Sequence, residues 1–301
     1  MKMTIIETIV YRAIKALFGV LALVPPKTGE KIALFLSKLW FVVDKRHRKV
    51  AIENLTHAFG DQMTASEINR IARKTFFYAT NMIFETPRVY ALKPGDVSKH
   101  YTVHGLHHLR AAHMRGKGVL MFSGHLGNWE ISVQLNNIAR LQVSGVYRKL
   151  DFAPAERYFH EKRESKGSRL YPLKGAVHEI LRELGLGNCM ALLIDQNAKR
   201  RQGVFIDFFG RTLCANMGPA YLALLTGAPV IMYFFVRENG KYRFEVLPEI
   251  PVFNSGDMEK DILVNTRNFN KALEGIIRRY PDQWFWIHNR WKTRPLAEPQ
   301  N

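Results

Sequence analysis

Residues 119–130, VLMFSGHLGNWE, decide the fold. The stretch begins with an apolar run of the length of a buried strand, which Ser123 and Gly124 end. His125 follows at a glycine-rich turn, where ligands collect beside the carboxyl ends of strands in α/β sheets. Gly124 and Gly127 let the chain bend back and allow close approach of a substrate. The stretch therefore predicts a strand that leads into a functional site.

Three more short apolar runs follow along the chain and predict further strands. They cover residues 143–147, 190–194 and 230–236. Segments with the pattern of helix or loop separate them, and the last, 258–279, is expected to be a helix. Asn239 and Gly240 predict a two-residue hairpin, so at least one antiparallel pair joins the sheet. We expect an α/β fold with a mixed, mainly parallel sheet flanked by helices.

The part of the chain before this sheet has a helical pattern. Residues 31–91 keep the apolar spacing of helices, and Thr64 with Glu67 forms a capping box that predicts a helix start. The basic stretch 45–49 suits either a solvated helix face or contact with phosphate groups. The fold is therefore expected to have a helical, membrane-associated N-terminal third.

Residues 1–26, MKMTIIETIVYRAIKALFGVLALVPP, form a separate element in our interpretation. The uninterrupted apolar run covers only 16–24, which is shorter than the roughly 20 residues that span a bilayer. The pattern favours a helix lying in a membrane interface, with a packed helix, a true span or a signal segment as alternatives. Residues 27–301 are expected to form one domain, helical to about residue 100 and α/β from about residue 103.

Composition narrows the class of protein. The chain has 301 residues, with 47% hydrophobic and 23% charged residues, a balance typical of globular proteins. Cys189 and Cys214 are the only cysteines and lack a metal-ligand spacing, so we expect neither a disulfide framework nor a metal site. The formal net charge of +18 requires an anionic partner: nucleic acid, an anionic membrane surface, or an acidic protein or substrate.

His125 and Glu130 have the spacing H-x-x-x-x-E and predict an acid–base pair. A carboxylate bonded to one ring nitrogen leaves the other nitrogen free to take a proton from a hydroxyl. The sequence has no nucleophile elbow and no P-loop, so we expect direct attack of a substrate hydroxyl on an activated acyl group. A histidine held in a turn for structural reasons is the alternative. His178 and Glu183 share the spacing, but in a helix they point about 140° apart, so we expect no catalysis there.

Five blocks, in their order and spacing, carry a family resemblance. They are RHRKVAIENLTHAF (46–59), FSGHLGNWE (122–130), VYRKLDFAPAERYFHEKRESKG (146–167), LLIDQNAKRRQGVFIDFFGRTLCANMGPAYLALLTGAPV (192–230) and PDQWFWIHNRWKTRP (281–295). Together they resemble the late acyltransferases of lipid A biosynthesis, the lauroyl/myristoyl transferase family of Gram-negative bacteria. The resemblance covers most of the chain.

The resemblance implies a glycerolipid-acyltransferase-like fold and an O-acyltransferase. Such an enzyme moves a fatty acyl chain from acyl carrier protein to a hydroxyl of a lipid A precursor, with no bound cofactor and no covalent acyl-enzyme. His125 is then the general base and Glu130 its partner. An arginine and an aspartate on which the family relies map onto Arg163 and Asp195. The position of the family's arginine in this sequence stays open, because three other arginines lie near Arg163: Arg148, Arg157 and Arg169.

Four residues are expected to bind substrate. Arg163 can clamp a phosphate of the donor or of the glycolipid, or form a surface ion pair. Asp195 and Gln196 end a buried run where a sheet presents functional groups, unless Asp195 is a cap. The Asn128 amide and the backbone N–H groups of 124–127 are candidate oxyanion donors.

The implied location is the cytoplasmic face of the inner membrane. The implied partners are acyl carrier protein, a lipid A precursor and an anionic membrane surface, without nucleic acid. Basic residues 199–201 suit the acidic carrier, lipid phosphates or a solvated loop, and the aromatic–basic stretch 284–294 suits a membrane interface or a packed cluster. Two alternatives stay open: an acyltransferase acting on another lipid or glycolipid, and a non-catalytic basic protein that binds membrane or nucleic acid.

Overall fold

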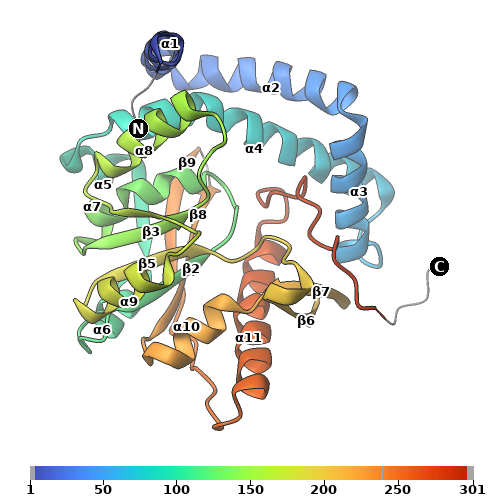
Figure 1. Ribbon diagram of the computed structural model, residues 1–301. Helices are drawn as coiled ribbons and strands as arrows, with labels where there is room; N and C mark the ends of the chain where they lie inside the picture. Colours follow the sequence, from blue (N-terminus) through green and yellow to red (C-terminus); the bar gives the residue numbers. More distant parts are fainter. Residues whose placement is uncertain (1–3, 239, 297–301) are drawn as a thin grey trace.

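A mixed sheet of seven strands forms the centre of the computed structural model, which describes residues 4–238 and 240–296 (Figure 1). The strands, in the order β1-β9-β8-β2-β5-β3-β4, are β1 Tyr101–His104, β9 Lys241–Val246, β8 Val230–Glu238, β2 Val119–Ser123, β5 Cys189–Leu193, β3 Val143–Tyr147 and β4 Leu170–Pro172. β9 is antiparallel to β8, and every other neighbouring pair is parallel. The expected mixed, mainly parallel sheet is confirmed.

The four expected strands are found within two residues of their predicted ends. The hairpin between β8 and β9 is also present: Glu238 pairs with Lys241, and Gly240 has a φ of 77°. Asn239, the other residue of the predicted turn, lies outside the described residues. A separate antiparallel pair, β6 Gly203–Phe208 and β7 Arg211–Asn216, was not expected.

Both faces of the sheet are buried, which explains why β2 is apolar without interruption. Leu120 and Phe122 belong to one core cluster, and Val119 and Met121 belong to the other. The helices of the α/β part flank these faces, and α11 has the predicted bounds. They are α5 Val97–His100, α6 Leu106–His113, α7 Leu135–Ala139, α8 Ala153–Glu164, α9 Val177–Gly185, α10 Gly218–Thr226 and α11 Met258–Arg279.

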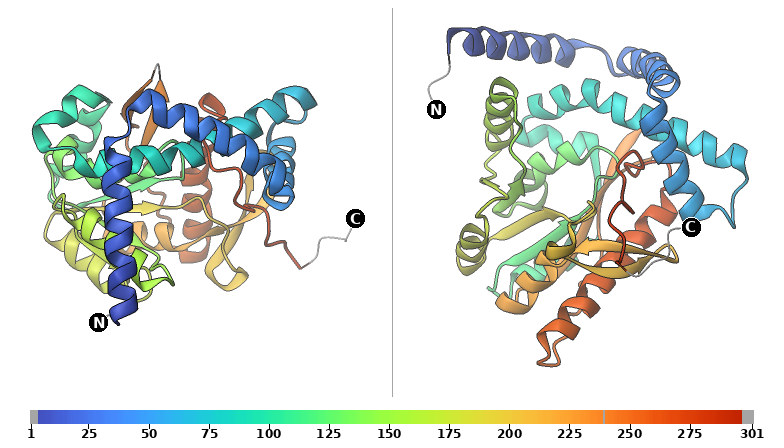
Figure 2. Two further views of the ribbon diagram at one scale, coloured as in Figure 1. Left: turned by 90° about the horizontal axis from the view of Figure 1, so that it is seen from above. Right: turned by 45° about the vertical axis from the view of Figure 1, so that its right-hand side comes forward.

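The first third of the described chain is helical, as expected. Its helices are α1 Ile5–Leu23, α2 Pro26–Val43, α3 Lys45–Phe59 and α4 Ala65–Ala91. The predicted capping box is present: the Thr64 hydroxyl accepts the Glu67 N–H, and the Glu67 carboxylate accepts the Thr64 N–H. α2 runs alongside α4 on one side of the sheet, and α1 turns away from α2 at an angle (Figures 1 and 2).

α1 and α2 leave large apolar side chains exposed. They are Ile5, Ile6, Ile9, Leu17, Val20 and Leu23 on α1, and Ile32, Leu34, Phe35, Leu36, Leu39, Val42 and Val43 on α2. Neither helix, nor any other in the described part, is by itself long and apolar enough to span a membrane. α1 and α2 meet that criterion only as a pair, with a bend of 116° between them. A membrane-interfacial element over residues 1–26 stays a prediction, and residues 1–3 of it lie outside the described part.

Candidate active site

His125 lies just beyond the carboxyl end of β2 and is held by Asp195, which lies just beyond β5. The ring Nδ1 is 2.7 Å from Asp195 Oδ1, and the His125 backbone N–H donates to Asp195 Oδ2 over 2.7 Å. The two strands are parallel neighbours with Ser123 opposite Leu193. The residues that follow them therefore meet at one edge of the sheet.

Gly124 and Gly127 of the turn allow close approach, as expected. In this structure the groups that approach them belong to the protein itself, whereas a substrate was expected there. A Cβ at Gly124 would lie 3.1 Å from Asp195 Oδ2, and a Cβ at Gly127 would lie 2.1 Å from the Phe235 carbonyl oxygen. Gly127 also has a φ of 61°, which side chains other than glycine rarely adopt. The close approach that these glycines permit is thus made by the protein's own residues.

The Asp195–His125 pair is electrostatically coupled. Burial opposes ionisation of Asp195, yet its carboxyl pKa lies well below the usual range because His125 and the Trp284 indole stabilise the anion. Burial also lowers the pKa of His125, but the charge and hydrogen bond of Asp195, with the charge of Glu130, raise it overall. With Nδ1–H donated to Asp195, the Nε2 lone pair is left for chemistry.

The expectation that Glu130 bonds to the His125 ring is wrong. The Glu130 carboxylate instead accepts two bonds from Arg163, from Nε over 3.0 Å and from Nη2 over 2.5 Å, and one from the Tyr90 hydroxyl over 2.6 Å. The physical reason is local: a 3₁₀ helix, Trp129–Gln134, starts directly after the turn and directs Glu130 toward α4 and α8. Asp195 bonds to the ring nitrogen of His125 that was predicted to bond to Glu130.

Arg163 and Glu130 form a second polar cluster of the site. Their side chains are 22% and 11% exposed, so the pair is mostly shielded from water. Burial disfavours the Arg163 cation, but the adjacent Glu130 charge raises the pKa of Arg163 overall, so Arg163 stays charged. Arg163 contacts the block that holds His125, through its bonds to Glu130. Its contact with substrate stays a prediction.

Several of the expected oxyanion donors form hydrogen bonds within the protein. The Asn128 side chain is fully buried; its amide donates to Glu85 on α4, and its oxygen caps the N–H of Glu130. The backbone N–H groups of Leu126 and Gly127 donate to Gly124 and Gln283, as that of His125 does to Asp195. A contact of Asn128 or of the backbone N–H groups of 124–127 with substrate stays a prediction.

Gln196 is the polar side chain at the opening of the site. It is exposed, and its Nε2 lies 3.5 Å from His125 Nε2. A small pocket opens here; its lining residues are His125, Asp195, Gln196, Trp284, Phe285 and His288. The Trp129 ring packs edge-on against His125, with ring centroids 4.9 Å apart. The reactive nitrogen thus faces an aromatic opening with one amide beside it.

The terminal segment, residues 281–294, builds one wall of the site. The Phe285 N–H donates to the His125 carbonyl over 2.9 Å, and the Trp284 indole donates to Asp195 Oδ2 over 2.8 Å. Its tryptophans are buried, so the aromatic stretch is the packed cluster rather than the membrane interface considered above. Nothing in the spacing of this block signals that it folds against residues 125 and 195, so its role in the site was missed.

The described residues contain no group of three or more His, Cys, Asp or Glu that could hold a metal ion. The fold and site define a class of α/β protein in which an aspartate at the end of one parallel strand holds a histidine at the end of the next. Within that class, the chain belongs to the bacterial lipid A biosynthesis acyltransferase family, whose model matches residues 2–293. The family resemblance noted from the five blocks is thereby confirmed.

Relatives share acyl transfer in their names but differ in the acceptor. The lipid A biosynthesis palmitoleoyltransferase of Escherichia coli K12 is 24% identical over 257 residues, covering 84% of this chain and 81% of its own. The phosphatidylinositol mannoside acyltransferase of Mycolicibacterium smegmatis is 29% identical over 219 residues, covering 69% and 67%. The lipid A biosynthesis myristoyltransferase of Escherichia coli K12 is 21% identical over 287 residues, covering 95% and 88%.

Proposed function

We propose that the chain is an O-acyltransferase that transfers a fatty acyl chain from acyl carrier protein to a hydroxyl of a lipid A precursor, with His125 as general base. The observation that carries this proposal is the buried Asp195 on Nδ1, which leaves Nε2 facing the pocket. Membership of the lipid A acyltransferase family supports the acceptor class.

The reaction proceeds by direct attack. Neutral His125 accepts the proton of the acceptor hydroxyl at Nε2, and the oxygen attacks the thioester carbonyl. Collapse of the tetrahedral intermediate breaks the C–S bond, and the imidazolium returns its proton to the departing thiolate. The products are an ester and a free thiol, without an acyl-enzyme. Asp195 stabilises the imidazolium, and the Gln196 amide, next to Nε2, is the donor best placed for the oxyanion.

The Arg163–Glu130 pair binds the acceptor in this proposal. Glu130 occupies the Nε and Nη2 groups of Arg163, which leaves N–H donors of the guanidinium for a phosphate group. Because Glu130 fixes the plane of the guanidinium, it acts through Arg163 as a positioning residue. His125 then acts on the reacting hydroxyl, and Arg163 binds the charged headgroup of the acceptor.

The donor approaches from the side of β6 and β7. Lys199, Arg200 and Arg201 follow Gln196, are exposed, and form no ion pair within the described part of the chain. Exposed cations next to a site opening attract an acidic partner such as a carrier protein. In Figure 1 this side of the molecule is remote from α1 and α2.

The acceptor approaches from the membrane. The exposed apolar side chains of α1 and α2 suit the interface of the inner membrane on its cytoplasmic face, and the net charge of +18 suits its anionic lipids. α4 connects this layer to the site, because it lies alongside α2 and carries Tyr90, which bonds to Glu130. Lipid acceptor and soluble donor thus reach His125 from different sides.

Acyl transfer by the purified full chain tests this function. Acyl carrier protein loaded with fatty acid is the donor, lipid A precursor and separately a phosphatidylinositol mannoside are the acceptors, and mass spectrometry follows the products. We expect one added acyl group on the lipid A precursor, lost by about 10³-fold in His125→Ala. His178→Ala is the matched control, since this exposed histidine of α9 has the same spacing to a glutamate.

Each outcome has a stated meaning. Acylation of the mannoside alone overturns the acceptor assignment and favours the glycolipid reaction named for the mycobacterial relatives, which are 29% identical. Transfer that survives His125→Ala overturns the assignment of the base. Transfer to neither acceptor overturns the proposed function.

A further inference from the structure

Arg290 is a fully buried cation directly behind the site. Its Nη1 donates to the Gln196 carbonyl over 2.7 Å and to the Cys214 carbonyl over 3.4 Å, and its Nη2 donates to Asn270 Oδ1 over 2.9 Å. Its Nε has no partner in the described residues, and no carboxylate there forms an ion pair with it. All of its partners are uncharged groups.

This arrangement is costly for stability alone. A buried charge needs a partner charge or a full set of hydrogen bonds, and Arg290 has neither. Burial lowers its pKa to about 10, with the charge of Asp195 acting in the opposite direction, so it remains a cation at neutral pH. An apolar side chain would fill the same position among Phe208 and its neighbours at lower cost.

We propose that Arg290 is a positioning residue that fixes the Asp195–Gln196 turn and offsets the charge of Asp195, so that His125 stays neutral and able to accept a proton. This inference rests on the proposed function, in which His125 is the base. The position of the guanidinium supports both parts, because it holds the carbonyl of Gln196, the residue next to Asp195 in the chain.

The carboxylates around His125 create the need for such a cation. Asp195 from the end of β5 and Glu130 from the 3₁₀ helix both favour the imidazolium. A general base must be neutral before it accepts a proton, so excess stabilisation of the imidazolium reduces the active fraction near neutral pH. Arg163 already neutralises Glu130, whereas Asp195 has no ion pair except with His125 itself in the described residues.

The other titratable groups on this side do not supply a charge as directly. Burial lowers the pKa of His288, which accepts the Asn197 N–H at Nε2 and is therefore neutral there. Burial raises the pKa of the Cys214 thiol, which stays protonated. Arg200 and Lys292 are exposed, and water screens their charges. Among these titratable groups, Arg290 is therefore the one that is both buried and positively charged.

The test compares variants of Arg290 that keep or remove the charge. Arg290→Gln removes the charge but keeps an amide that can donate to Gln196, and Arg290→Lys keeps the charge but loses the planar fork. In kcat/KM against pH, we expect the acid limb of Arg290→Gln to move upward by about one pH unit. For Arg290→Lys, the acid limb should stay at the pH of the wild type. Its kcat should fall, because lysine holds the Asp195–Gln196 turn less firmly than arginine does.

A second variant changes the charge without touching Arg290. Asn270→Asp is nearly isosteric and places a carboxylate where Oδ1 now lies, 2.9 Å from Nη2. It neutralises the guanidinium in place and should move the acid limb upward as well. This variant keeps the proposal testable if Arg290→Gln does not fold, which the thermal melting of each variant establishes.

A readout other than activity separates this inference from the proposed function. NMR of isotope-labelled histidine follows the titration of the His125 ring, with His125→Ala to assign the signal. An upward shift of this titration in Arg290→Gln or Asn270→Asp supports the inference even if no acyl transfer is found. A folded Arg290→Gln whose His125 titration and acid limb match the wild type overturns it.

Discussion

The same spacing, H-x-x-x-x-E, occurs at His125–Glu130 and at His178–Glu183, yet only the first lies in a site. In neither place does the glutamate hydrogen-bond to its histidine. Each glutamate instead pairs with arginine and tyrosine side chains: Glu130 with Arg163 and Tyr90, Glu183 with Arg169, Arg182 and Tyr171. The spacing H-x-x-x-x-E therefore does not by itself predict whether a histidine belongs to a site.

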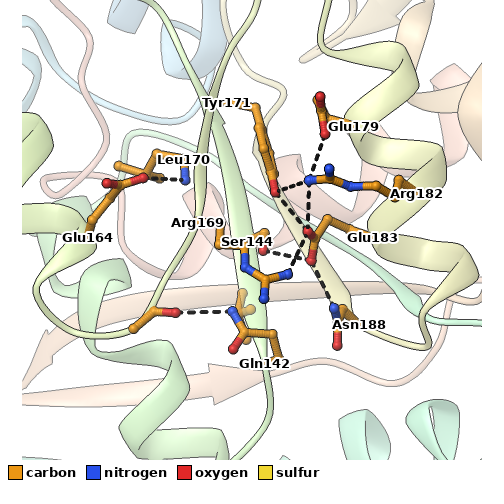
Figure 3. A network of polar contacts seen from close by, with 12 residues as sticks. Gln142, Ser144, Glu164, Arg169, Leu170, Tyr171, Glu179, Arg182, Glu183 and Asn188 are labelled. Atoms are coloured by element: carbon orange, nitrogen blue, oxygen red, sulfur yellow. Dashed lines mark hydrogen bonds and ion pairs between the residues drawn. The ribbon is translucent and has the colours of Figure 1, made fainter.

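The two regions differ in what reaches the histidine and in what surrounds the glutamate. His125 receives Asp195 from the neighbouring strand, whereas His178 is exposed on α9. The Glu183 side chain is 0% exposed and accepts further bonds from Ser144 and Asn188 (Figure 3). Glu183 is a satisfied structural anchor between β3, β4 and α9. The end of a second strand, rather than a local motif, supplies the carboxylate that holds the His125 ring.

The largest expected effect sharpens this contrast between Asp195 and Glu183. Asp195→Asn should lower kcat by about 10³-fold, because the amide no longer stabilises the imidazolium or fixes the Nδ1–H tautomer. Glu183→Gln should leave kcat within about twofold, since its cluster lies away from the pocket-lining residues. Single-turnover acyl transfer measures both, and equal losses in the two variants would contradict the distinction.

A smaller effect is expected at Glu130. Glu130→Gln should lower kcat/KM by about 10²-fold, because Arg163 loses the partner that orients it. Arg163→Met should cost a similar amount, and the double variant little more than either single one. Kinetics of the three variants give this double-mutant cycle. Additive losses would show that Glu130 acts on its own, as a direct partner of the base does.

Secondary structure was the part of the molecule that sequence predicted well. The apolar runs of β2, β3, β5 and β8, and the length of α11, follow from burial on both sides of the sheet and from helical spacing. Position 195 was singled out as a substrate contact, which stays a prediction. Its pairing with His125 depends on which strand lies beside β2, and local spacing carries no information about strand order.

The same limit explains the error at Glu130. This residue was assigned from its distance along the chain to His125, whereas its partner Arg163 lies 33 residues away. The terminal segment was missed for the same reason, since Trp284 reaches Asp195 across 89 residues. The positions of these side chains depend on contacts between residues far apart in the sequence. Such contacts form only in the tertiary fold, so local spacing does not predict them.

The stability of the Glu183 cluster gives the next expected effect. Glu183→Gln should lower the free energy of unfolding by about 2 kcal/mol, because a buried carboxylate with several charge-assisted hydrogen bonds becomes a neutral amide. Arg169 and Arg182 are half-exposed and can turn to water, which limits the loss. Urea unfolding at pH 7 measures it, with His178→Ala as the control from the same helix. An unchanged midpoint would show that the network contributes nothing net.

The smallest effect is the dependence of that difference on pH. Burial alone would raise the pKa of Glu183, but hydrogen bonds from Tyr171, Asn188 and Arg169 lower this pKa below its usual range. A carboxyl whose pKa is depressed by folding stabilises the protein above its unfolded pKa and loses that contribution as pH falls through the folded pKa. The difference between wild type and Glu183→Gln should therefore be constant from pH 8 to about pH 5 and shrink below that. A difference that grows on acidification would mean that Glu183 is protonated in the folded protein, so that its cluster would be a neutral hydrogen-bond network.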